Sequence, residues 1–203
     1  MDRGLFVVFE GIDACGKSTQ ARRAALERRA LFTFEPGDSP LGSELRRWLL
    51  DAQSPMTPST EALLMLADRS HHVHSVIEPR LASGGSVVSD RFDASTLAYQ
   101  GYGRGLNLAA LRAATNLAIG SCSPDVTILI DVSLHVADER RGRDHKDRFE
   151  SADLAFHERV RAGYLALAAS DVEHWCVVDG SASEDEVAGE IATRLDGLAW
   201  PSG

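Results

Sequence analysis

Residues 11–18 carry the residue types needed to hold a chain of phosphates. They satisfy the pattern G-x-x-x-x-G-K-[ST] in full, and they read Gly11-Ile12-Asp13-Ala14-Cys15-Gly16-Lys17-Ser18. Glycines at both ends let successive backbone N–H groups turn inward around an anion at a helix N-terminus. The Lys17 ammonium would reach the outer phosphates, and the Ser18 hydroxyl could ligate Mg²⁺. The segment therefore predicts a nucleoside-triphosphate site.

The flanking sequence predicts a strand before this loop and a helix after it. The apolar run Leu5–Phe9 precedes the loop and a helix-forming run begins at Thr19, which is the strand–loop–helix setting that the motif requires. The alternative is a glycine-containing turn that happens to hold a lysine. Because the pattern is complete and in context, we expect Gly11 to Thr19 to bind the nucleotide, with Cys15 as a small filler whose backbone matters.

Two aspartates at predicted strand ends are candidates for the metal side of the site. A triphosphate enzyme needs a second carboxylate near the phosphate loop to hold or orient hydrated Mg²⁺. Asp90 and Asp131 both end apolar runs, and a helix N-cap is the alternative role for either. We favour Asp90, because Arg91 follows it directly and would bring a phosphate-binding guanidinium to the same point. Asp13 could point toward an acceptor.

A basic segment at residues 139–150 predicts a lid. It puts five cations within nine positions of an otherwise acidic chain. Such a run is usually a solvated helix face. Phosphoryl transfer, however, gains most from cations that meet the developing charge as water is shut out. Arg143 and Arg148 are our catalytic candidates in this segment, since the planar donor fork of arginine suits phosphate oxygens.

The elements that must position these residues alternate along the chain. Short apolar runs predict strands at 5–10, 30–34, 86–90, 125–131 and 174–178,. Helical spacing lies between and after them, at 17–29, 40–51, 60–82, 94–120, 151–170 and 183–196. This alternation predicts an α/β fold with a five-stranded parallel sheet flanked by helices, in which ligands bind beyond the carboxyl ends of the strands.

Composition predicts one ordinary soluble domain spanning residues 1–203. The chain is 44% hydrophobic and 25% charged,. Its 21 Lys and Arg stand against 30 Asp and Glu, a formal net charge of -9. The general attraction to polyphosphate that drives nucleic-acid binding is therefore missing, and we expect no nucleic-acid partner.

The cysteines and the apolar runs predict a cytoplasmic protein without a membrane partner. Cys15, Cys122 and Cys176 lie far apart and form no C-x-x-C pair, which disfavours structural zinc and a disulfide framework. No apolar stretch approaches the ~18 residues of a membrane span, and the N-terminal apolar run is too short for a signal peptide.

Taken together, the motifs resemble the thymidylate kinases of bacterial type. The matching pieces, in family order, are Phe9–Gln20, Glu35-Pro36-Gly37, Ala67-Asp68-Arg69, Asp90-Arg91-Phe92, Ser95–Gly101 and Asp147–Glu150. The phosphate loop alone would indicate only a large superfamily. The segment Asp-Arg-Phe running into Ser-Thr-x-Ala-Tyr-Gln-Gly is much more specific.

The resemblance implies a nucleoside monophosphate kinase fold, commonly a homodimer, that transfers the γ-phosphoryl of Mg-ATP to dTMP. It implies that Arg91 holds the acceptor phosphate and that Asp90 orders Mg²⁺ through water. Tyr99 would crowd the 2′ side of the sugar. The implied acceptor-binding set is Asp13, Glu35, Pro36, Met65, Arg69, Arg91, Thr96, Tyr99 and Gln100. The implied catalytic cations are Lys17, Arg91, Arg143 and Arg148.

Departures from the family pattern bear on the acceptor base. Phe34 and Asp38 stand where the family pattern T-R-E-P-G-G has arginine and glycine, and Met65 stands where an aromatic residue usually stacks on thymine. Methionine lacks an aromatic face, so the base contact should be less selective. The same chemistry on dUMP or a 5-modified pyrimidine is therefore the first alternative, and a non-catalytic nucleotide-binding protein is the second.

Three neighbouring histidines invite a metal-site interpretation. They are His71, His72 and His74. On a helix, residues 71 and 74 align while residue 72 lies about 100° round from residue 71. We therefore expect partly exposed helix histidines rather than a metal site.

Overall fold

A computed structural model describes residues 3–141, 148–149 and 152–200 of the chain. It contains a parallel five-stranded sheet in the order β2-β3-β1-β4-β5. The strands are β1 (Phe6–Glu10), β2 (Leu31–Phe34), β3 (Val87–Asp90), β4 (Val126–Asp131) and β5 (Trp175–Asp179). Each coincides with a predicted strand to within one residue at either end, which confirms the predicted fold class.

The central strand β1 places the phosphate loop between two neighbours. All five of its residues are buried, as expected for a strand covered on both faces. Its register pairs Phe9 with Asp90 on β3 and Glu10 with Leu129 on β4. Because the chain winds outward in both directions from β1, a crevice opens beyond its carboxyl end. The Gly11–Ser18 loop lies at this point.

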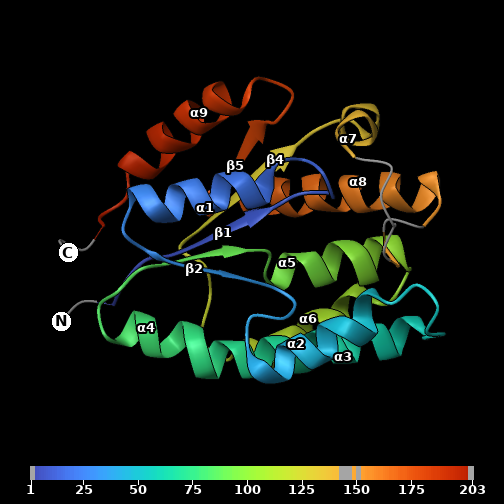
Figure 1. Cartoon of the computed structure of the whole chain (residues 1–203). Coiled ribbons are helices and arrows are strands. Elements are labelled where there is room, and N and C mark those ends of the chain that lie inside the picture. Colours follow the sequence, from blue (N-terminus) through green and yellow to red (C-terminus); the bar gives the residue numbers. More distant parts are fainter. Residues whose placement is uncertain (1–2, 142–147, 150–151, 201–203) are drawn as a thin grey trace.

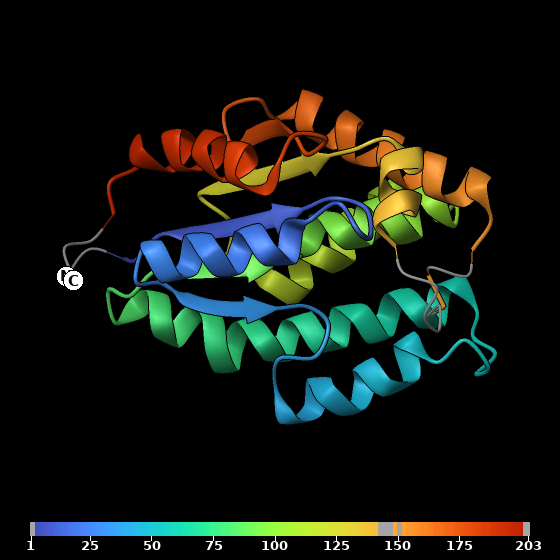
Figure 2. The ribbon, with the colours of Figure 1, turned by 45° about the horizontal axis from the view of Figure 1, so that its top comes forward.

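Helices cover both faces of the sheet (Figures 1 and 2). α1 (Lys17–Glu27) and α9 (Glu184–Asp196) pack against each other on one face. The longest helices on the other face are α3 (Pro58–His72), α6 (Leu108–Ile119) and α8 (Leu154–Ser170). The shorter helices are α2 (Pro40–Leu50), α4 (Glu78–Ala82), α5 (Asp93–Thr96) and α7 (Leu134–Arg140). None of the helices in the described ranges is long and apolar enough to cross a membrane.

The predicted helix at 94–120 is interrupted in the structure. α5 is followed by a π-helical segment, Leu97–Gly103, and α6 begins only at Leu108. The interruption has a local cause, since Gly105 adopts a φ of +78° and the Asn107 side chain caps α6 by accepting from the Ala110 N–H at 2.9 Å,. Such π-helical turns are frequent at functional sites, and this one carries Tyr99 and Gln100.

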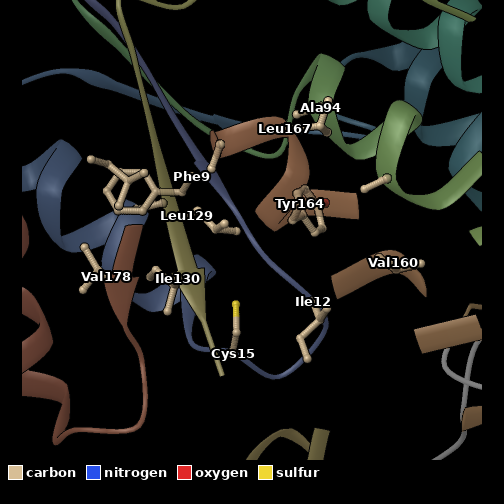
Figure 3. Packing of buried hydrophobic residues seen from close by; sticks show 14 of the residues in the cluster. Phe9, Ile12, Cys15, Ala94, Leu129, Ile130, Val160, Tyr164, Leu167 and Val178 are labelled. Atoms are coloured by element: carbon tan, nitrogen blue, oxygen red, sulfur yellow. The ribbon is translucent and has the colours of Figure 1, made fainter. Parts of the chain in front are cut away.

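The hydrophobic core forms two clusters, and β1 contributes side chains to both. Strand alternation places Val7 and Phe9 in the larger cluster and Phe6 and Val8 in the smaller one,. Figure 3 shows part of the larger cluster, with side chains from β1, β4, β5 and α8 around the base of the phosphate loop. The loop is therefore attached to the rigid centre of the sheet.

Candidate active site

The phosphate loop has the backbone that its glycines predict. Gly11 and Gly16 have φ angles of +146° and +97°. A Cβ on Gly11 would lie 2.5 Å from the Ile130 carbonyl oxygen and 2.7 Å from the Cys15 sulfur, so no larger residue fits there. Cys15 is 2% exposed and points into the core beside Ile130 (Figure 3). It packs as a filler and leaves its backbone to the loop.

The Lys17 ammonium lies against this loop. Its Nζ donates to the Ile12 carbonyl oxygen at 3.3 Å and lies 3.7 Å from the Asp13 carboxylate. The side chain is 7% exposed and lines the large pocket beside the loop. A buried cation with so few partners is available to a phosphate that enters the loop.

The two candidate aspartates differ in their partners. Asp90 Oδ2 accepts from the Ser18 hydroxyl, while its Oδ1 is buried with no hydrogen-bond partner in the part of the chain that the structure describes. Asp131 instead forms a bidentate pair with Arg161, with both distances 2.7 Å. The structure therefore brings Asp90, and not Asp131, to the hydroxyl of the phosphate loop.

Ser18 and Asp90 fit a magnesium ion that depends on phosphate for most of its shell. No group of three or more histidine, cysteine or acidic side chains in the described ranges could hold a metal ion on its own. Mg²⁺ in kinases is held by one or two protein oxygens together with phosphate oxygens and water. The unpartnered Asp90 Oδ1 beside the Ser18 hydroxyl is such a donor set.

The Arg91 guanidinium occupies the centre of a hydrogen-bond cluster. Its Nη2 donates to Asp13 Oδ1 at 2.5 Å, and its backbone has a φ of +73°. A non-glycine residue in this region is uncommon, and such strain gathers at functional sites. Four further bonds, of 3.1–3.2 Å, run to the Gly11 carbonyl, the Ser95 and Tyr164 hydroxyls and the Tyr99 hydroxyl.

A buried glutamate, Glu10, holds the turn that carries Arg91. Its side chain accepts from the backbone N–H of Phe92 at 2.9 Å and of Ser95 at 3.1 Å. It also accepts from the Ser95 hydroxyl at 2.7 Å and from the Tyr164 hydroxyl at 2.9 Å. Complete burial raises the pKa of Glu10,. Our sequence interpretation did not assign Glu10 a role, although its place at the end of β1 was a usable signal.

Asp13 is the negative partner in this cluster. Burial alone would raise its pKa, but the charges of Arg91 and Lys17 outweigh that effect and hold the pKa of the carboxyl well below its usual range,. Asp13 is therefore ionised at neutral pH, and its negative charge offsets the positive charge of Arg91 beside the phosphate loop.

A pocket of about 610 Å³ joins the phosphate loop to the rest of the predicted set. It is lined by the predicted residues Asp13, Lys17, Ser18, Glu35, Pro36, Met65, Arg69, Asp90, Arg91, Thr96, Tyr99 and Gln100. Phe34, which departs from the family pattern, lines it too. Residues from four separate stretches of sequence thus meet in one hollow.

Arg69 binds residues from separate segments of the chain at this pocket. The side chain is 2% exposed. Its Nε donates to Glu35 Oε2 at 2.8 Å, its Nη1 to the Thr96 hydroxyl at 2.7 Å and its Nη2 to the Phe92 carbonyl at 2.8 Å. A guanidinium carries five N–H donors, so these three bonds within the described ranges leave two for a ligand.

The expectation for the three histidines is wrong for one of them. His72 is fully buried. Its ring nitrogens lie 2.9 Å from Glu35 Oε1 and 2.6 Å from the Thr33 hydroxyl. The burial of His72 is caused by tertiary packing. The side of α3 that carries His72 lies against the turn that follows β2, where His72 and Arg69 both bind Glu35.

The structure places Arg148 away from the pocket. Its guanidinium donates to the carbonyl oxygens of Leu49 at 3.2 Å and Asp51 at 2.8 Å, and also to that of Ser54. It thus caps the end of α2, and it lines a second, smaller hollow. Arg143 lies outside the described residues. Arg140, which precedes it, points its Nη1 at the Cys15 carbonyl at 3.5 Å.

Two further arginines line the pocket that our sequence interpretation did not single out. They are Arg22 on α1 and Arg46 on α2. Arg22 follows Ser18 by four residues, a spacing that places both on one helix face and that could have identified it. Arg46 donates to the Pro36 carbonyl at 2.5 Å and lies over the Phe34 ring. An acidic protein thus concentrates cations here, as a phosphate-binding pocket requires.

Comparison with known proteins identifies the family. The sequence profile described as "Thymidylate kinase" matches residues 9–191. This chain belongs to the thymidylate kinase family. It is 45% identical to the thymidylate kinase of Burkholderia vietnamiensis, covering 98% of this chain and 100% of that protein. It is 43% identical to that of Geobacter sulfurreducens, covering 95% and 96%.

A solved member of the thymidylate kinase family has the same fold. The crystal structure of the thymidylate kinase from Ehrlichia chaffeensis matches with a TM-score of 0.79 at 29% identity, covering 94% of this chain and 98% of that chain. The resemblance drawn from the motifs is confirmed, and so is the nucleoside monophosphate kinase fold.

Proposed function

We propose that this protein transfers the γ-phosphoryl group of ATP to dTMP, giving ADP and dTDP. The single observation that carries the proposal is the pocket in which Lys17 and Ser18 of the phosphate loop face the same space as Arg91, Arg69 and Gln100. Such a pocket can hold a phosphate donor at one end and a pyrimidine monophosphate at the other. Membership of the thymidylate kinase family supports the same reaction.

The donor end grips the triphosphate through its charge. Backbone N–H groups of the loop and the Lys17 ammonium bind the β- and γ-phosphates. Ser18 and Asp90 would hold Mg²⁺, which when bound neutralises charge on the phosphate oxygens. No covalent intermediate is needed, because positioning and charge neutralisation account for catalysis in this class of reaction.

The acceptor end brings the dTMP phosphate into line with the donor. Arg91 holds that phosphate through its Nε–H and through Nη donors that exchange their present partners for phosphate oxygens,, and the ionised Asp13 keeps the guanidinium in place. The Tyr99 ring is fixed by its hydroxyl, which donates to Asp13 at 2.8 Å. A fixed ring in this position favours a sugar without a 2′-hydroxyl. Arg143 is our candidate for the cation that closes over the transferred group.

The acceptor base distinguishes the leading proposal from its alternatives. With ATP and Mg²⁺, we expect the highest kcat/KM for dTMP among dTMP, dUMP, 5-hydroxymethyl-dUMP, dCMP and dAMP, measured by coupled ADP release. Met65 should make the ratio of kcat/KM for dTMP to kcat/KM for dUMP smaller than an aromatic residue would, because methionine provides apolar contact without an aromatic face. A clear preference for dUMP or a 5-modified pyrimidine would replace dTMP as the acceptor. ATP binding without product at high enzyme concentration would leave only a nucleotide-binding protein.

We also propose that the protein is a homodimer through α3 and α6. These helices contact each other, and each exposes a leucine: Leu63 is 65% exposed and Leu117 is 87% exposed. Exposed apolar side chains on neighbouring helices are typical of an association surface.

The Leu117→Asp variant should therefore be monomeric. Light scattering after gel filtration should give the wild type twice the chain mass of 21.9 kDa and the variant that mass once. The control is Leu26→Asp on α1, where the leucine is 81% exposed but lies on the opposite face of the sheet. A monomeric wild type, or equal dissociation in both variants, would contradict the proposed interface.

A further inference from the structure

We propose that Glu61 sets which pyrimidine the pocket accepts, by fixing the orientation of the Gln100 side-chain amide. Glu61 acts through Gln100 as a positioning residue and does not itself contact the base. The inference rests on the proposed function, since it takes the acceptor base to lie against Gln100.

The two side chains meet in the protein interior. Glu61 lies in the first turn of α3 and is 2% exposed, while Gln100 lies in the π-helical segment and is 1% exposed. The Gln100 Nε2 donates to Glu61 Oε1 at 3.0 Å. Gln100 lines the large pocket, whereas Glu61 lines the second hollow beside it. Glu61 therefore contacts Gln100 from the side away from the substrate.

An ion pair holds the glutamate in turn. Arg104 Nε lies 3.3 Å from Glu61 Oε1, and its Nη2 lies 3.2 Å from Oε2. Both carboxylate oxygens are thus engaged by the guanidinium, which holds the group in a fixed position,. Gln100 therefore faces a rigid acceptor.

The fixed Glu61 carboxylate determines which end of the Gln100 amide faces it. A glutamine side chain carries an acceptor oxygen and an NH₂ donor, and rotation about its last bond exchanges them. An ionised carboxylate can only accept, so the NH₂ group must face Glu61. The carbonyl oxygen, on the opposite side of the amide, is then the acceptor that Gln100 offers to the pocket it lines.

That orientation selects a base by its ring nitrogen. Thymine and uracil carry an N–H at ring position 3, which a carbonyl oxygen accepts. Cytosine carries a bare acceptor nitrogen there and would repel the same oxygen. Arg69, with its two spare N–H donors, suits the adjacent carbonyl of thymine or uracil and opposes the amino group of cytosine. With cytosine bound, the polar groups of Gln100 and Arg69 would be left unpaired, which gives strong discrimination against that base.

The Glu61→Gln variant should weaken this discrimination. A glutamine at position 61 can donate as well as accept, so the Gln100 amide could turn either way. We expect the ratio of kcat/KM for dTMP to kcat/KM for dCMP to fall by about tenfold or more. Glu61→Asp, which keeps a carboxylate, should retain most of the wild-type ratio. The matched control is Glu44→Gln, since Glu44 forms an exposed pair with Arg47.

A double-mutant cycle separates this role from a structural one. Gln100→Leu removes the amide that Glu61 is inferred to orient, so adding Glu61→Gln to it should lower the ratio no further. An unchanged ratio in Glu61→Gln, or an equal fall in the Gln100→Leu background, would overturn the inference. A wild type that fails to phosphorylate dTMP would instead overturn the proposed function. Thermal melting of each variant shows that the comparison is between folded proteins.

Discussion

Lys17→Ala is expected to lower kcat for dTMP phosphorylation by about 1000-fold, because a preorganised charge on the transferred phosphoryl group is worth that much in comparable sites. Among the described residues the ammonium has only the Ile12 carbonyl at 3.3 Å and Asp13 at 3.7 Å as partners, so its loss should leave the fold intact. Steady-state kinetics at saturating ATP and dTMP, with a thermal melt, would measure both effects.

The control for Lys17→Ala is Arg23→Ala, on the same helix. Arg23 pairs with Glu27 and Asp185 at the surface and does not line the pocket, so its loss should change kcat less than about twofold, as expected for an exposed ion pair. Near-normal turnover by Lys17→Ala would remove the phosphate loop from the mechanism.

Arg91→Lys is expected to lower kcat by about 100-fold or more, although the positive charge is kept. The Arg91 guanidinium reaches Asp13 at 2.5 Å while also bonding the Tyr99 and Tyr164 hydroxyls. A lysine has three rotatable donors and no planar fork, so it cannot reproduce this geometry or hold a phosphate in a bidentate manner. The loss should appear in kcat more than in the KM for dTMP.

Arg161→Lys is the matched control for Arg91→Lys. Arg161 also forms a bidentate pair, with Asp131, but its side chain is 35% exposed. Activity should remain within about twofold of the wild type, as for other exposed pairs. A fall confined to KM in Arg91→Lys would place Arg91 in ground-state binding and outside the transition state.

The features that the sequence predicted correctly are those with a local physical cause. The fully buried strand β1 is recognisable because each residue of Phe6–Glu10 is apolar except the last. The loop after it is recognisable because Gly11 and Gly16 occupy φ values that favour glycine,. The set of residues lining the pocket came from the family resemblance, and the parallel sheet explains it, since carboxyl ends of neighbouring strands share one edge.

Features that depend on long-range partners could not be predicted in this way. Spacing alone did not distinguish Asp90 from Asp131, because the difference lies in strand register and in Arg161, which follows Asp131 by thirty residues. The burial of His72 depends on the turn at Glu35. The role inferred for Glu61 likewise depends on Gln100, which is distant in sequence and meets it only through the packing of α3 against the π-helical segment.

The placement of Cys15 has a consequence for how the protein responds to oxidants and alkylating reagents. Its thiol is turned into the core beneath the loop and is 2% exposed. Burial also raises the pKa of this thiol, so little of the nucleophilic thiolate is present at neutral pH. A cysteine can therefore sit inside a nucleotide-binding motif without making it a redox sensor: peroxide or maleimide would react first at the partly exposed Cys176.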